Sequence, residues 1–115
     1  MPKPELEFFA IDTIEWTPVG QGVPGLYERI LARDSGTGAA TRLLRFDPGC
    51  NTSAAGVQAH PFWEEVYILA GAFRDLTLGQ TFSKGAYACR PPGMRHGPWE
   101  SAEGCITFEV RYYST

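Results

Sequence analysis

The chain has 115 residues, a formal net charge of −3 and a pI near 5.3. This length suits one domain, so we expect a single domain over residues 1–115, with its core in 26–113 and an N-terminal strand and loop in 1–25. Lysine and arginine are scattered, which argues against a nucleic-acid-binding surface. No apolar run reaches the length of a membrane span, so we expect no membrane partner.

The cysteines and the N-terminus indicate a compartment. Cys50, Cys89 and Cys105 form no CxxC pair, and the first residues show neither a basic nor an apolar region of a secretion signal. We therefore expect a reduced, cytoplasmic protein. No residue near Cys50 or Cys105 in the sequence would lower a thiol pKa, so both are interpreted as buried structural residues rather than nucleophiles.

The pattern of the first half predicts short strands. Thirteen glycines and nine prolines interrupt any helical pattern, whereas the aromatic and β-branched residues suit strands. We expect a first strand around 8–16, followed by a turn-rich segment, 17–25, that cannot be a core strand. The runs 26–33 and 40–46 predict a hairpin around a glycine-containing turn, and a loop of small residues follows over 50–57.

The second half continues in the same way. The run 63–73 is apolar on both faces after its carboxylates, which predicts a strand buried on both sides. A hairpin is expected over 75–82, a short strand over 86–90 and an alternating final strand over 105–113. Turn positions are assigned to Gly71, Gly79, Gly85 and Gly93. Strands separated by turns every roughly eight to twelve residues predict an all-β sandwich or small barrel.

A histidine and a carboxylate precede the central strand. Three residues separate His60 from Glu64, and Glu64 shares a strand face with apolar side chains, while Glu65 can point outward. A carboxylate on an apolar face must be paired, protonated or bound to a cation. The alternative is that both glutamates are solvated and that His60 and His96 are ordinary polar residues.

The other histidine lies in a second motif. Gly85, Pro91, Gly93 and His96 have the spacing of the second motif of the cupin superfamily, and His60, Glu64 and Gly71 fit the later part of its first motif. The Pro91-Pro-Gly-Met-Arg-His96-Gly-Pro98 segment, followed by Gly104-Cys105, resembles the cupin domains of anti-sigma factors and of acetylacetone-cleaving dioxygenases. The resemblance covers about residues 40–113 and implies an antiparallel jelly-roll β-barrel of the RmlC-like type.

The resemblance also implies a metal. Cupins with the full pattern hold a divalent metal through three histidines and a glutamate, but here Gln58 stands at the first histidine, and Glu100 replaces a motif asparagine. The remaining set, His60, Glu64 and His96, suits Fe²⁺, with Zn²⁺, Mn²⁺ and Ni²⁺ as alternatives. Gln58 is a candidate fourth ligand, through a weak amide oxygen, or it orients a metal-bound water. A metal-free cupin is the alternative.

Further residues are candidates for a pocket. Four aromatic residues either line its mouth or belong to the core: Phe62, Trp63, Trp99 and Phe108. Among them, Phe62 and Phe108 are predicted to contact substrate. Four charged residues form either a polar lining or an exposed face: Arg42, Arg45, Glu109 and Arg111.

Open coordination positions on such a metal suggest an enzyme. The first hypothesis is dioxygenase-type oxygen insertion into a small oxygenated molecule that is enolisable or phenolic, and the second is Lewis-acid isomerisation or hydrolysis. The rival is a non-catalytic small-molecule-binding or sensor barrel, since fold alone does not fix function. A homodimer is expected, because extended terminal strands leave edges that need covering.

Overall fold

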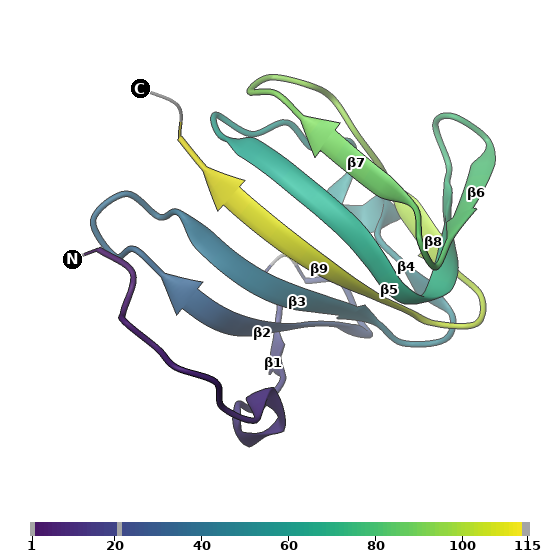
Figure 1. Cartoon of the computed structure of the whole chain (residues 1–115). Coiled ribbons are helices and arrows are strands. Elements are labelled where there is room, and N and C mark those ends of the chain that lie inside the picture. Colours follow the sequence, from purple (N-terminus) through teal and green to yellow (C-terminus); the bar gives the residue numbers. More distant parts are fainter. Residues whose placement is uncertain (1, 21, 114–115) are drawn as a thin grey trace.

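The computed structural model describes residues 2–20 and 22–113 and is built almost entirely from β-strands (Figure 1). The strands are β1 (Thr17–Pro18), β2 (Leu26–Arg33), β3 (Ala40–Phe46), β4 (Cys50–Asn51), β5 (Trp63–Asp75), β6 (Gln80–Ser83), β7 (Tyr87–Arg90), β8 (Trp99–Ser101) and β9 (Cys105–Tyr112). Two short 3-10 helices, η1 (Ile11–Thr13) and η2 (Ser53–Ala55), accompany them. The all-β prediction is confirmed. In the described part of the chain, no helix is long and apolar enough to cross a membrane.

All the strand pairs are antiparallel, and β5 is central to them. The strand order is β1-β2-β3-β9-β5-β8-β4, and β6 and β7 also pair with β5. The first half of β5 lies between β9 and β7, whereas its second half pairs with β6 and β8. The sheet curls so that β4 and β8 lie behind β5 (Figure 1), giving the jelly-roll barrel. The predicted hairpin of β2 and β3 is confirmed over its whole length.

Gly71 lets β5 change partners midway. Its φ of +73° is unfavourable for other residues, and a Cβ at this position would collide with the carbonyl oxygen of Gly104. The sequence assigned Gly71 to a turn, but it lies inside the strand, where the chain passes from its pairing with β9 to its pairing with β6. The glycine of the first motif is therefore required by close backbone contact.

The prediction that β5 is buried on both faces is wrong. Val66 and Ile68 are buried, but Tyr67 and Leu69 on the opposite face are 44% and 39% exposed. The barrel wall is one sheet thick at this point, so only the inward face is covered. The hydrophobic core lies at one end of the barrel and comprises Val23, Leu26, Leu44, Phe46, Cys50, Ile68, Phe73 and Cys105.

The final strand, β9, turns its polar face inward. Thr107 and Glu109 are buried, with 0% and 6% of their surface exposed, whereas Phe108 and Val110 on the other face are half-buried. The predicted alternation of β9 is confirmed. The polar set faces the interior because Glu64 on β5 and Arg111 on β9 are register partners, and partners share a face.

The expected strand over 8–16 is absent. This segment contains η1 and makes no sheet pairing; the first pairing is between Thr17 and Glu28. Trp16 holds the segment to the barrel instead, because its indole packs against the guanidinium groups of Arg29 and Arg45, whose Cζ atoms lie 4.3 and 4.9 Å from the ring centroid. The loop predicted over 50–57 also contains β4 and η2.

Candidate metal centre

Backbone hydrogen bonds join the histidine-bearing loops of the two motifs. Gln58 and His96 form an isolated bridge in which Gln58 N donates to His96 O at 2.7 Å and His96 N donates to Gln58 O at 2.9 Å. Gly93 N also donates to His60 O at 2.8 Å. These bonds fix the two histidine-bearing loops against each other, and Glu64 enters the same space from the start of β5.

The structure brings together the three predicted ligands His60, Glu64 and His96. One ligand atom of each lies within 4.8 Å of the others. His96 Nε2 is 3.8 Å from Glu64 Oε1, and the two imidazole rings are 4.9 Å apart between centroids. Two imidazoles and one carboxylate in such proximity fit a divalent transition metal, and small movements of the side chains would bring all three donors to one ion.

The protonation of both histidines suits metal binding. His96 Nδ1 lies 3.2 Å from the carbonyl oxygen of Met94, which can only accept, so Nδ1 carries the proton and Nε2 keeps its lone pair. Burial, reinforced by Arg90, lowers the pKa of His96 to about 4. Burial, together with Arg111, also lowers the pKa of His60. Both imidazoles are therefore neutral at physiological pH, the form that ligates metals.

Glu64 points inward, as predicted, and Glu65 points outward. Glu64 is 4% exposed and accepts a hydrogen bond of 2.8 Å from Arg90 Nη1. Burial raises its pKa, the charge of Glu109 adds to this effect, and Arg90 opposes it. Glu65 instead accepts hydrogen bonds from the hydroxyl groups of Tyr87 and Tyr112 on the outer surface.

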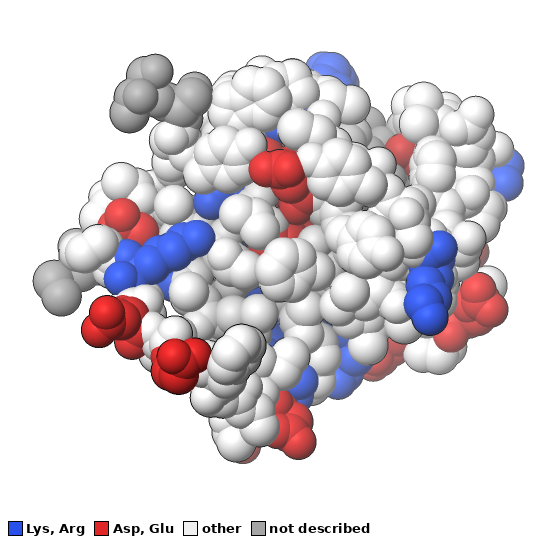
Figure 2. All heavy atoms as spheres, in the orientation of Figure 1, with Lys and Arg blue, Asp and Glu red and all other residues white. Residues whose placement is uncertain are grey.

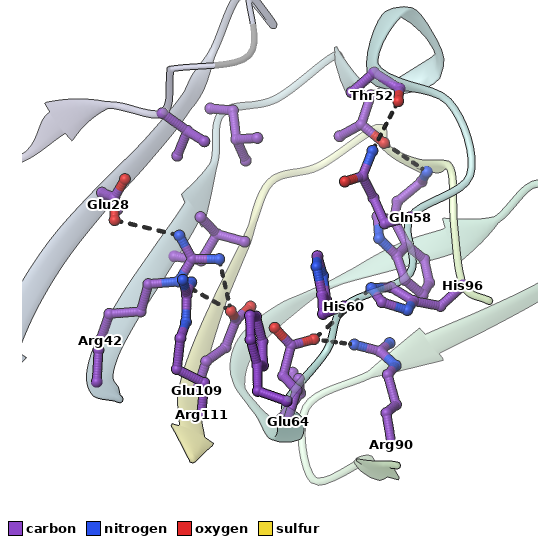
Figure 3. A pocket seen from close by; sticks show the side chains of 18 of the residues that line it. Glu28, Arg42, Thr52, Gln58, His60, Glu64, Arg90, His96, Glu109 and Arg111 are labelled. Carbon is purple, nitrogen blue, oxygen red and sulfur yellow. Dashed lines mark hydrogen bonds and ion pairs between the residues drawn. The ribbon is translucent and has the colours of Figure 1, made fainter. Parts of the chain in front are cut away.

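Gln58 lies in the wall of the same cavity. Its side-chain Nε2 donates to the carbonyl oxygen of Ala55 at 2.7 Å, which tethers the amide to η2. Figure 3 shows its side chain beside those of His60 and His96. The residue thus occupies the neighbourhood expected for the replaced histidine.

A cavity of about 490 Å³ opens beside the candidate ligands. Arg42, Glu109 and Arg111 belong to its lining, so the polar-lining interpretation holds for them. Arg42 bridges two acids, with Nη1 3.2 Å from Glu28 Oε1 and Nη2 2.9 Å from Glu109 Oε1 (Figure 3). Burial opposes ionisation of Glu109, but Arg42, the hydroxyl of Thr107 and Arg90 together outweigh it and lower the pKa of this carboxyl.

Arg45, the remaining charged residue that the sequence offered for a polar lining, has another role. Arg45 lies on the outside, where its Nε is 3.0 Å from Asp47 Oδ1 and its guanidinium packs on the ring of Tyr27. It does not line the cavity.

The aromatic candidates divide between the two sides of the wall. Phe62 lines the cavity and stacks on His60, with ring centroids 4.7 Å apart, and Trp99 also lines it. Phe108 lies on the outer face of β9, paired in register with Tyr67, and is not part of the lining. Phe108, which was predicted to contact substrate, therefore does not face this cavity, because side chains alternate along β9 and its neighbour Glu109 faces inward. Trp63 stacks on Tyr112, away from the cavity.

Among the lining residues that the sequence did not indicate, Glu28 and Arg90 form ion pairs inside the cavity. Each is positioned by pairing between strands: Arg90 on β7 is the register partner of Glu64, and Glu28 reaches Arg42 across β2 and β3.

The cysteines behave as predicted, since Cys50 and Cys105 are buried and burial raises the thiol pKa of Cys105 to about 12.

Comparisons with known proteins support this fold. The profile of the ChrR Cupin-like domain family matches residues 5–113. An RmlC-like cupin from Shewanella frigidimarina is similar with a TM-score of 0.74 and 21% identity, over 99% of this chain and 96% of that one. An acetylacetone dioxygenase from Acinetobacter johnsonii has a TM-score of 0.72 and 15% identity, over 93% and 73%.

A third similar structure is Rhodobacter sphaeroides SigE in complex with the anti-sigma ChrR. It has a TM-score of 0.63 and 25% identity, and the match covers 90% of this chain and 52% of that chain. Among curated proteins no match was found. Because the family profile matches nearly the whole length, the chain belongs to the ChrR cupin-like family.

Proposed function

We propose that this cupin binds one divalent transition metal through His60, Glu64 and His96 and acts on a small oxygenated molecule in the adjoining cavity. The observation that carries the proposal is the convergence of these three donor atoms within 4.8 Å at the wall of that cavity. Fe²⁺ is the favoured metal, because two histidines and one carboxylate leave open positions of the kind used by non-haem iron. Zn²⁺, Mn²⁺ and Ni²⁺ are alternatives.

The chain's own residues prepare the site. Arg90 fixes one oxygen of Glu64, and the Met94 carbonyl sets the tautomer of His96. When bound, the metal would supply Lewis-acid polarisation of a substrate oxygen and, if it is iron, reactivity toward O₂. Phe62 and Trp99 provide apolar surface for the carbon skeleton of the substrate.

The experiment for this function is oxygen consumption by anaerobically Fe²⁺-loaded protein. A 1,3-diketone such as acetylacetone is the first substrate to test, since a similar fold belongs to an acetylacetone dioxygenase. We expect Fe²⁺-dependent oxygen uptake that His96→Ala abolishes. Stoichiometric metal binding without turnover of diketones or phenols would favour the second candidate, a non-catalytic sensor. That candidate is supported by the similarity to the anti-sigma ChrR and by Gln58 at the position of a ligand histidine.

Gln58→His is predicted to tighten metal binding. The residue lies in the cavity wall and its backbone is bridged to His96, so an imidazole there would complete a four-ligand set. Imidazole is a far better donor than a neutral amide. The affinity can be measured by competition with a chromophoric chelator, with the exposed Gln80→His on β6 as the matched control. Unchanged or weaker binding would mean that the side chain at position 58 cannot reach the metal.

We also propose that the protein is a homodimer that buries the outer face of β5, β7 and β9. This outer aromatic surface comprises Trp63, Tyr67, Tyr87, Phe108, Val110 and Tyr112, and the carboxylate of Glu65 lies among them. Figure 2 shows this face as largely uncharged. A two-fold contact places each surface against itself, which favours an uncharged face. Light scattering at micromolar concentration should give the dimer mass, and Tyr67→Lys should shift it toward the monomer. A monomeric wild type would refute this assembly.

A further inference from the structure

Arg111 occupies a special place in the cavity wall. It lies near the end of β9 on the inward face, where Ala40 and Glu64 are its register partners. Its Cζ lies 5.0 Å from the ring centroid of Phe62, the residue that also stacks on His60. Figure 3 shows Arg111 beside Glu109 and Arg42, across the cavity from Arg90 and His96. The guanidinium and the candidate metal ligands therefore face the same space.

The other buried arginines of the cavity have direct carboxylate partners, but Arg111 has none among the described residues. Arg42 is paired with two glutamates, Glu28 and Glu109, and Arg90 is paired with the third, Glu64. These are all the acidic residues in the cavity lining. Among the residues that the structure describes, no carboxylate lies within ion-pair distance of Arg111. Arg33 also lines the cavity without an ion pair, but it is exposed. Arg111 is thus the one partly buried arginine of the described lining that has no direct carboxylate partner, although the charges of the cavity glutamates still act on it.

This arrangement is costly without an anion. Arg111 is partly buried, so water compensates its charge incompletely, and the nearby guanidinium of Arg42 repels it. An arginine remains charged even under these conditions, because its intrinsic pKa is so high. An incoming anion would accept hydrogen bonds from the planar fork of Arg111 and would relieve the repulsion between the two cations.

The surroundings favour a singly charged anion. Glu109 and Glu64 lie in the same cavity and would repel a doubly charged phosphate more strongly than a carboxylate. The phenyl ring of Phe62 contacts both Arg111 and His60, so a ligand a few atoms long can span from the guanidinium to the metal ligands. A carboxylate matches the paired N–H groups of the guanidinium.

We propose that Arg111 anchors the carboxylate of the molecule that this cavity binds, so that the ligand class is a small organic acid. The second part of the assignment, a ketone or hydroxyl oxygen directed at the metal, rests on the proposed function. Recognition of the carboxylate does not rest on the proposed function, since it depends on Arg111 alone. The charge that Arg111 contributes thereby becomes the specificity determinant of the cavity.

Titration calorimetry with two matched probes tests this assignment. Benzoylformate carries a carboxylate beside a ketone and cannot enolise, and its methyl ester has nearly the same shape without the charge. In Zn²⁺-loaded wild type, we expect the acid to bind at least roughly tenfold more tightly than the ester, and inorganic phosphate to bind more weakly than the acid. Arg111→Gln should remove the preference for the acid. Arg74→Gln, at an exposed residue of β5 outside the cavity lining, should retain it.

Measuring the metal content of every sample separates the two proposals. If Arg111→Gln keeps wild-type zinc and wild-type preference for the acid, or if the wild type binds acid and ester equally, the anchor is refuted while the metal site stands. If zinc is not retained by any sample but the metal-free wild type still prefers the acid in an Arg111-dependent way, the metal function fails and the anchor stands. Arg111→Lys should keep part of the preference, because it keeps the charge but loses the fork.

Discussion

Replacing His96 with alanine is expected to remove most of the bound metal. Only two imidazoles are available in this chain, and the substitution leaves one imidazole and one carboxylate, too few donors for tight binding of a first-row metal. The backbone bridge between His96 and Gln58 does not involve the side chain, so the loop should keep its position. Elemental analysis after anaerobic loading and gel filtration is the measurement.

Arg95→Ala is the matched control, since Arg95 is exposed in the same loop and offers no ligand atom. It should retain wild-type metal. Equal metal content in His96→Ala and the wild type would show that His96 is not a ligand, and equal loss in both variants would show that the loop itself had been disturbed.

Substitutions of the adjacent residues Glu64 and Glu65 should differ sharply in their effect on metal affinity. Glu64→Gln replaces a buried charged oxygen donor with a neutral one and leaves Arg90 without its counter-charge, so metal affinity should fall by more than the roughly 10- to 100-fold typical of changes around a metal ligand. The folded state should also lose stability, because breaking a buried ion pair leaves one charge uncompensated. Chelator competition and thermal unfolding would measure the two effects.

Glu65→Gln serves as the comparison one residue away. Its carboxylate faces outward and is held by two tyrosine hydroxyls, so metal affinity should stay at the wild-type value. Stability should fall slightly as those hydrogen bonds weaken. The reverse order of metal affinities would mean that β5 is shifted by one residue, and that Glu65 faces the histidines.

The clustering of His60, Glu64 and His96 could be predicted because its signals are local. Only three residues separate His60 from Glu64, just where β5 begins. The spacing of glycines and prolines around His96 is specific to its loop. The strands with strong alternation or clear turns were also found, including β9 and the hairpin of β2 and β3.

The parts that were missed depend on contacts distant in sequence. Whether Phe108 or Glu109 faces inward is decided by the register of β9 against β5, which the alternation alone does not give. Arg90 belongs to the site because it lies on β7 opposite Glu64 on β5. The segment before β1 has a composition typical of strands. It forms no sheet pairing, however, and Trp16 packs against arginine side chains instead.

The meeting of charged residues inside the barrel also depends on contacts distant in sequence. Glu28, Arg42 and Glu109 come from three strands, and nothing in the sequence near any one of them indicates that they meet. Alternation predicts that each lies on one face of its strand. Pairing of the strands then places the three faces together, and the lack of a direct carboxylate partner for Arg111 becomes visible only when all the pairs are known.

The central claim is tested most directly by the metal stoichiometry of untagged wild-type protein purified without chelator. After anaerobic loading with Fe²⁺, Mn²⁺, Ni²⁺ or Zn²⁺ and removal of free ions, elemental analysis should find close to one equivalent of a transition metal per chain for at least one of these ions. Stoichiometry near zero with all four ions would contradict the metal centre and would identify the protein as a metal-free cupin.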